Sequence, residues 1–279
     1  MNKRKKLIVF SGIVIIAILL VISAISFSVY RNKYVIFKDN FIEFSARVNL
    51  HESGGILRTD AERLQLFIMY DETMQNQTTL EDLKNFPNIV MLGTMSSTYF
   101  DTEEERAEFE KTHSISRREY EKYAGQLQEV LPDLEKLKAI VLCPETIILD
   151  MSPFMGADQV EELRINTNQV EDLTGIGEME SLRILDVSNN KITDIKALKE
   201  LNNLEALDIS QNNIENIDIL LELPQLKVLS YKTDDKEQEK ILDKLRDKGC
   251  VAIQNSSAFL DTIDEKGIKR VDFRSLDNY

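Results

Sequence analysis

The stretch Leu182–Leu201, LRILDVSNNKITDIKALKEL, is followed at Leu204–Leu223 by a near copy, LEALDISQNNIENIDILLEL. The two copies are 22 residues apart, and a less similar copy begins 22 residues earlier at Val160. Seven apolar positions and one asparagine recur in phase in all three copies. One such unit cannot bury its apolar edge alone, so the repeat predicts coils that stack into a solenoid around one continuous core.

The spacing L-x-x-L-x-L-x-x-N resembles the leucine-rich repeat, and the 22-residue form with ITDI after the asparagine is similar to the bacterial internalin type. This resemblance covers about residues 137–231. It implies an α/β fold, a short solenoid with parallel strands on its concave face, and a role in host or surface interaction. We expect the recurring asparagine amides to bond backbone groups of adjacent coils as a structural ladder. Its members are Asn168, Asn190 and Asn212.

The first thirty residues differ in composition from the remainder. Residues 1–6 carry four positive charges, and residues 7–30 contain no charged residue. As a helix rising ~1.5 Å per residue, residues 7–30 would extend about 36 Å, enough to cross a hydrocarbon core of ~30 Å. We therefore expect a cytoplasmic basic stub followed by a single transmembrane signal anchor, with the C-terminal part of the chain extracytoplasmic. A cleaved signal peptide is the alternative.

Four regions are predicted. They are residues 1–30 (stub and transmembrane helix), 31–130 (an α+β membrane-proximal region or N-terminal cap), 131–255 (leucine-rich repeats with a C-terminal cap) and 256–279 (a tail that lies against the cap or is mobile).

Weaker patterns are present inside these regions. Residues 34–50 suggest two short strands, residues 63–70 suggest a third, and residues 80–92 have the spacing of a first coil. From Asp101 to Leu131 the chain carries helix signals, first in residues 101–113 and again in 116–131, which stop before Pro132. The coil before the first clear repeat needs one additional residue, which we place in CPETI at 143–147.

Residues between the repeated leucines should point out of the concave face, because side chains alternate along a strand. They form three columns: Glu162, Ile184, Ala206, Val228; Arg164, Asp186, Asp208, Ser230; and Asn166, Ser188, Ser210, Lys232. Asp186 and Asp208 should lie ~5 Å apart on neighbouring strands, which is unfavourable unless Arg164 or a cation from a partner compensates. The predicted partner contacts are Arg164, Ile184, Asp186, Ser188, Asp208 and Ser210.

The sequence offers few candidates for catalysis. His51 and His113 are the only histidines, and neither has the ligand spacing of a zinc site. Cys143 and Cys250 are the only cysteines, and coil stacking would hold them ~20 Å apart, too far for a disulfide. We predict unpaired thiols, no catalytic residue, no cofactor and no metal. A recurring polar column is expected to cap turns rather than bind calcium: Asp150, Asp172, Asp194 and Asn216.

Net charge limits the classes of partner. The formal charge is −14, and because residues 1–30 contribute four positive charges, the remainder carries −18. Such a surface excludes non-specific binding of nucleic acid and favours either simple solubility or a basic protein partner. The sequence predicts a non-catalytic module that binds a protein and is held in a membrane by residues 7–30, with no small-molecule substrate. Two alternatives remain open: a structural role in envelope assembly, and an enzyme regulator with activity in residues 31–130.

Overall fold

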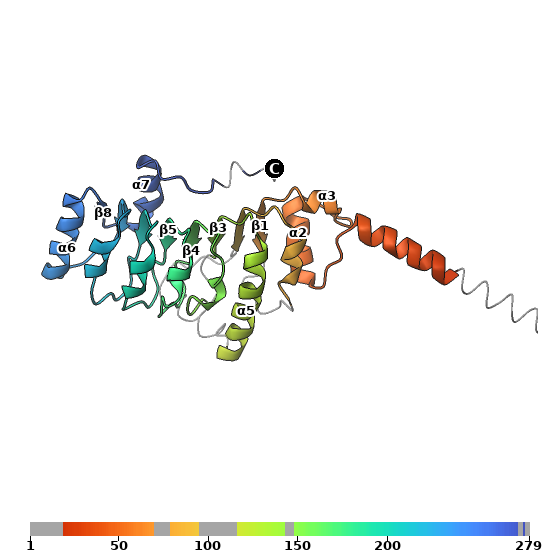
Figure 1. The fold of residues 1–279 in the computed structure, drawn as a ribbon, viewed down its shortest axis with the longest axis horizontal. Coiled ribbons are helices and arrows are strands. Elements are labelled where there is room, and N and C mark those ends of the chain that lie inside the picture. The colour runs from red at the N-terminus through yellow and green to blue at the C-terminus, as the bar shows by residue number, and fades with distance from the viewer. Residues whose placement is uncertain (1–18, 70–78, 95–115, 143–147, 273–275, 277–279) are drawn as a thin grey trace, which may run out of the picture.

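The strands form a single parallel layer. The computed structural model describes residues 19–69, 79–94, 116–142, 148–272 and 276. Each strand pairs with the next one in the chain, from β1 to β8 (Figure 1), which confirms the predicted parallel-stranded solenoid. The strands are β1 Leu66–Met69, β2 Met91–Thr94, β3 Ala139–Val141, β4 Glu162–Arg164, β5 Ile184–Asp186, β6 Ala206–Asp208, β7 Val228–Ser230 and β8 Val251–Ile253.

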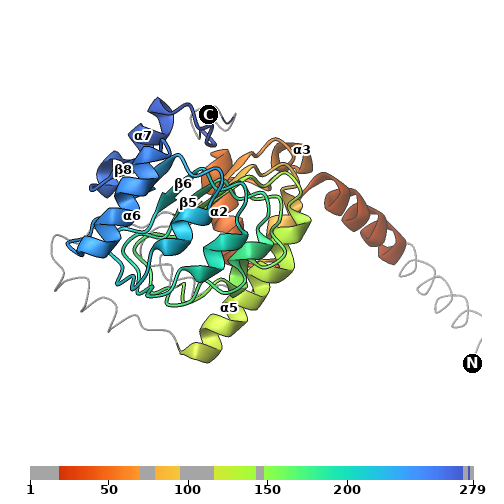
Figure 2. The same ribbon diagram turned by 60° about the vertical axis from the view of Figure 1, so that its left-hand side comes forward.

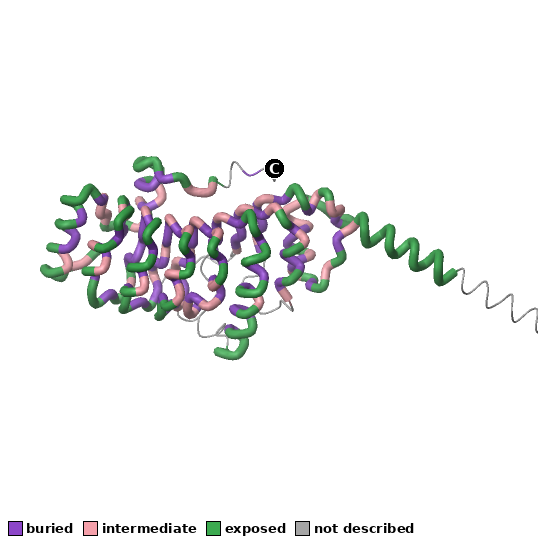
Figure 3. The backbone as a smooth tube through the Cα atoms, in the orientation of Figure 1, coloured by how far each residue is buried: buried purple, intermediate pink, exposed green. Residues whose placement is uncertain are grey.

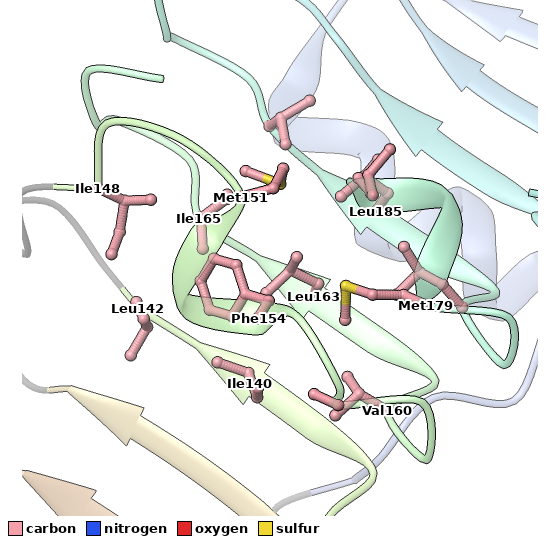
Figure 4. Close-up of a cluster of buried hydrophobic side chains, with 14 of the residues drawn as sticks. Ile140, Leu142, Ile148, Met151, Phe154, Val160, Leu163, Ile165, Met179 and Leu185 are labelled. Atoms are coloured by element: carbon pink, nitrogen blue, oxygen red, sulfur yellow. The ribbon is translucent and has the colours of Figure 1, made fainter. Parts of the chain in front are cut away.

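The repeated leucines stack into one dry core. Leu163, Leu185, Leu207 and Leu229 are direct partners across β4 to β7, and all four are fully buried. Ile140 pairs with Leu163 at an offset of 23 residues, so the coil before the first clear repeat is one residue longer, as expected. Residues 143–147, where we placed that extra residue, lie outside the described part. Figure 4 shows Ile140, Leu163 and Leu185 among the buried side chains between the strands and the opposite wall.

The wall opposite the strands consists of short 3-10 turns. Each begins after a polar residue of the recurring column, whose side chain accepts a hydrogen bond from the backbone N–H two residues later at 2.7 to 3.1 Å. These bonds are the turn caps that the spacing predicts. The turns are η3 Ser152–Phe154, η4 Ile176–Glu178, η5 Lys196–Glu200 and η6 Asp218–Glu222.

The N-terminal end is closed by α2 (Asn40–Leu50), followed by α3 (Arg58–Ala61). Our expectation of two strands in residues 34–50 is wrong. Asp39 accepts hydrogen bonds from the N–H groups of Phe41 and Ile42 at 2.8 and 3.0 Å, which starts a helix at this point. The helix buries Ile42 and leaves Phe44 about half exposed, so the alternation that suggested a strand does not reflect burial.

The described part of residues 31–130 continues the solenoid and adds two strands to the same sheet. β1 and β2 extend the same parallel array, with Leu92 of β2 opposite Ile140 of β3. The 3-10 turn η1 (Glu81–Asn85) follows the expected first-coil pattern, in which Leu80, Leu83 and Phe86 are fully buried. This region therefore serves as the first coils and the N-terminal cap together.

Helix α5 (Arg117–Val130) occupies the second of the two stretches where the sequence predicts helix, and η2 (Leu131–Asp133) follows it. The first stretch, residues 101–113, lies outside the described residues. Ser116 and Glu119 form a reciprocal capping box that fixes the start of α5. The hydroxyl of Tyr120 donates to Oδ1 of Asp150 at 2.8 Å, which ties α5 to the next coil. Burial raises the pKa of Tyr120 to about 12, so this hydroxyl stays protonated and remains a donor.

The C-terminal end is closed by α6 (Lys236–Asp247), which packs beside β8 at the end of the core (Figure 2). Asp235 caps its start, and Gly249 adopts a positive φ of 91° just after its end. A second element follows that the sequence did not predict. It comprises η7 (Ser256–Ala258) and α7 (Phe259–Glu265), which lie on the strand side of the solenoid.

Residues 19–33 form a helix that projects from the solenoid. Its side chains are exposed throughout 19–33 (Figure 3), with Leu20 and Phe27 exposing 65% and 60% of their surface. Within the described residues, no helix combines the length and the apolar character needed to cross a membrane. The first part of the predicted span, residues 7–18, lies outside the described residues, so the transmembrane anchor stays a prediction.

Candidate functional site

The concave face carries the three predicted columns, but much of it is covered. Ile184 and Asp208 are 1% and 0% exposed, and Ser188 and Ser210 are also buried. The alternation of side chains along a strand predicts that these residues face solvent between the leucines. Of the predicted contacts, Arg164 and Asp186 retain intermediate exposure. The assignment of the six residues as partner contacts stays a prediction, whereas the expected accessibility of Ile184, Ser188, Asp208 and Ser210 is wrong.

The cover is the chain's own C-terminal segment, defined here as residues 255–272. Phe259 and Ile263 of α7 pack on the apolar column, together with Ile268 from the stretch after it. The column side chains beneath them are Ile184, Ala206 and Val228. The tail is thus neither confined to the cap nor wholly exposed: it folds back along the strands because the apolar column offers it a place to bury these side chains.

The same segment continues toward the first strands. Val271 and Leu276 contact an apolar cluster at the N-terminal half of the concave face, which includes Leu66, Met91 and Ala139. The backbone N–H of Val271 donates to Oε2 of Glu162 at 3.1 Å. The C-terminal residues therefore cross most of the sheet.

An acidic pair lies in the middle column. Asp186 and Asp208 are direct partners on β5 and β6. Each carboxylate accepts two hydrogen bonds at its Oδ1 from the serine two residues later: one from the backbone N–H and one from the hydroxyl. Ser188 and Ser210 therefore donate their hydroxyl protons within the protein, and they orient the carboxylates.

The electrostatics of this pair are unfavourable. Burial, and next the neighbouring Asp208 carboxylate, raise the pKa of Asp186 to about 6. The C-terminal segment gives Asp208 a neutral donor, because the Ser256 hydroxyl lies 2.6 Å from its Oδ2. Arg164, which the sequence suggested as the compensating cation, places its Nε 3.0 Å from Oε1 of Glu162. Arg164 therefore forms its ion pair with Glu162 and not with Asp186. Burial raises the pKa of Glu162 as well.

A ladder of alternating charge, which we did not predict from the sequence, lies beside the apolar column. Each member comes from one of five consecutive coils and lies one residue before the start of its strand: Lys138, Glu161, Arg183, Glu205 and Lys227. The charged nitrogen and oxygen atoms of successive members lie 2.9, 3.7, 3.3 and 3.2 Å apart. The signal was available as a fourth column in the repeat alignment. Because the pairs are partly exposed, each contributes only ~0 to 1 kcal/mol, and the ladder mainly fixes the pattern of charge along this edge.

The asparagine ladder connects successive coils. Asn190 accepts from the backbone N–H of Val170 at 2.9 Å and donates to the carbonyl oxygens of Ile165 and Val187 at 3.1 and 3.0 Å. Asn168 and Asn212 make the equivalent bonds one coil earlier and one coil later. These amides hold the turns beyond the strands, so they shape the concave face without being presented on it.

Of the residues considered for chemistry, the structure describes His51 and Cys250, which lie beside different elements. His51 is exposed at the end of α2, and Cys250 is a buried free thiol whose pKa burial raises to about 11. His113 and Cys143 lie outside the described residues. In the described part of the chain, no group of three or more His, Cys, Asp or Glu side chains could hold a metal ion.

Stacked coils of one strand each, joined by an asparagine ladder, define a solenoid repeat protein. Residues 158–214 match the leucine rich repeat family. This part of the chain is therefore a leucine-rich repeat region, and its 22-residue period resembles that of the internalin type. No curated protein matches the sequence.

Similar folds occur among solved structures. Internalin C2 from Listeria monocytogenes is 20% identical over 71% of this chain and 95% of its own, with a TM-score of 0.39. The internalin InlF from the same organism is 16% identical over 71% of this chain and 65% of its own, with a TM-score of 0.41. TLR13, solved as a complex with ssRNA13, is 18% identical over 62% of this chain and 23% of its own, with a TM-score of 0.43. These likenesses concern the fold alone.

Proposed function

We propose that this protein is a membrane-anchored, non-catalytic module that binds another protein through the concave face of its solenoid. The observation that carries the proposal is the concave face itself, which binds a helical segment through an apolar column and through Asp208 of the adjacent acidic pair. A surface that already accommodates α7 of this chain has the shape and chemistry to accommodate a segment of another protein.

The proposed anchoring is supported by the N-terminal residues. The helix of residues 19–33 exposes large apolar side chains, and residues 7–18 before it continue the uncharged run in the sequence. Exposed apolar surface of this extent is stabilised by a lipid environment. The acidic solenoid would then stand outside the cytoplasm, where it would meet its partner.

Site-specific photocrosslinking in intact cells tests the binding face. A photoreactive amino acid is placed at Asn166 or at Lys232, which belong to the third concave column and are not buried, and in a matched variant at Lys199 on the opposite wall. We expect a crosslinked product with a different protein from the concave positions and none from Lys199. Products from Lys199 alone would contradict the assignment of the face, and products containing only this chain would favour the envelope-assembly role.

A further inference from the structure

The C-terminal segment is packed against the solenoid without being part of its spine. Phe259 and Ile263 belong to an apolar cluster on the concave surface, whereas Leu185 and Leu207 belong to the main core beneath the sheet. The two clusters lie on opposite faces of the same strands, since side chains alternate along a strand. Release of the segment would therefore leave the packing of the main core in place.

The order of the segment depends on the sheet. α7 has seven residues, a length at which an isolated helix is not stable in water. Within the described residues, its polar links to the solenoid include Ser256 to Asp208, Arg183 Nη1 to the carbonyl of Lys269 at 3.3 Å, and Val271 to Glu162. A segment held in this way can exchange with a competing one.

The segment leaves polar groups beneath it incompletely satisfied. Ser230 is the strand partner of Asp208 and is fully buried, yet its hydroxyl makes no hydrogen bond within the described structure. Buried hydroxyls normally have a partner, so this orphan marks a position that a better-matched occupant would serve.

Charge is also unmatched at this place. Arg270, one of the segment's cations, pairs with Asp264 of the same segment at 2.8 Å. In the described part of the chain, no ion pair joins a cation of residues 255–272 to Asp186 or Asp208. An ammonium or guanidinium group would form stronger, charge-assisted hydrogen bonds with the pair than the Ser256 hydroxyl does.

We propose, building on the protein-binding role above, that the partner inserts a short amphipathic helix which displaces residues 255–272 from the concave face. The helix carries an aromatic and a β-branched side chain four residues apart, as Phe259 and Ile263 are. Three residues before the aromatic side chain it carries a lysine or arginine, at the place of Ser256. The cation reaches the acidic pair and the neighbouring hydroxyl of Ser230.

Synthetic peptides provide the probe. The first has the sequence of residues 254–272, the second has the same sequence with Ser256→Lys, and the third is the second with Phe259→Ala and Ile263→Ala. Each is labelled and titrated, by fluorescence anisotropy, into the full-length chain in detergent. The chain is used both as wild type and as a Phe259→Ala, Ile263→Ala variant whose own segment is loosened.

We expect the lysine peptide to bind the loosened chain ~10-fold more tightly than the native-sequence peptide, because a charge-assisted bond replaces a neutral one. The peptide without the two apolar side chains should bind ~10-fold or more weakly than the lysine peptide. The wild-type chain should bind every peptide more weakly than the loosened chain. Equal affinities of the first two peptides would contradict the proposed role of a cation in the partner. If no peptide bound the loosened chain, the proposal of a helical partner would be wrong.

A second variant tests the proposal without the Phe259→Ala and Ile263→Ala substitutions. Ser256→Lys in the full-length protein should slow hydrogen exchange at residues 259–263 and weaken capture of the lysine peptide. Unchanged exchange would contradict the proposal, as would collapse of the solenoid in the loosened variant, which would make the segment an integral part of the fold. Concave crosslinks to another protein combined with failed peptide binding would leave the proposed function standing and remove only the helical partner.

Discussion

Asp186 links the stability of the solenoid to pH. Its pKa is about 6 in the folded chain, and Asp208, Arg164 and Ser188 are the groups that face it. In the unfolded chain the carboxyl titrates near ~3.9, so between these values the folded state binds more protons than the unfolded state. The protonated carboxyl therefore contributes stability below about pH 4, and this contribution is lost as the pH rises through about 6.

We predict that Asp186→Asn removes this dependence. The asparagine Oδ1 can still accept from Ser188, while its neutrality ends the repulsion by Asp208, so the free energy of unfolding near pH 7.5 should rise by about 1 to 3 kcal/mol. Urea unfolding of variant and wild type at about pH 4.5 and 7.5 measures the difference. Asp194→Asn is the matched control, because the pKa of that exposed carboxyl is lowered by hydrogen bonds from Lys196. A gain equal at both pH values would contradict the prediction.

At the scale of single residues, the sequence predicted the contacts that the 22-residue period determines. The bonds of Asn190 go to backbone groups of its own and the preceding coil, so the period alone places them. The pairing of Asp186 with Asp208 follows from the same register. The bond from Ser256 to Asp208 joins residues 48 positions apart and outside the repeat, and no periodic signal could have revealed it.

Among the elements, α2 has a role beyond covering the core. Asn49, in its last turn, accepts from the N–H of Ile68 at 3.0 Å and donates to the carbonyl of the same residue at 2.8 Å. The amide thus takes the place of a further strand beside β1 and ends the sheet at an edge that would otherwise offer unpaired backbone groups.

We expect Asn49→Ala to lower the free energy of unfolding by about 1 to 3 kcal/mol, because two backbone groups of Ile68 lose their partner. Hydrogen exchange at Ile68 should accelerate in the variant, while exchange in β5 and β6 should not change. Asn40→Ala, an exposed position at the start of the same helix, is the control and should have little effect on either measurement. Unaltered protection of Ile68 would show that the amide does not seal this edge.

The elements also show why local patterns misled. The apolar residues of 34–50 permit both strand and helix, and the decision comes from the Asp39 cap together with burial against the first coil. α5 was predictable, because its capping box is encoded within four residues. α7 was not, since its stability depends on an apolar column contributed by three strands far earlier in the chain.

On the scale of the whole molecule, the solenoid is built from neighbour contacts, and the C-terminal residues are the exception. A stack of repeats owes its stability to each coil and the coil beside it. The bond from Val271 to Glu162 spans 109 positions, and Leu276 reaches a cluster that contains Leu66 of β1. Displacement of this segment would therefore remove contacts along most of the sheet. A chain with a bound partner would then differ from the unbound chain over most of its concave face.

The proposed orientation of the whole chain makes a final prediction. The positive charges of residues 1–6 favour a cytoplasmic N-terminus, and the proposed span of residues 7–30 would place the acidic solenoid outside. Protease added to intact cells should destroy a C-terminal epitope tag and spare an N-terminal one, which would remain on a short membrane fragment. Replacing Lys3, Arg4, Lys5 and Lys6 with glutamine should increase the protected fraction of the C-terminal tag, because the charge bias that sets the orientation is lost. Protection of the C-terminal tag in the unaltered chain would reverse the topology, and an N-terminal tag missing from the mature chain would indicate a cleaved signal peptide instead of an anchor.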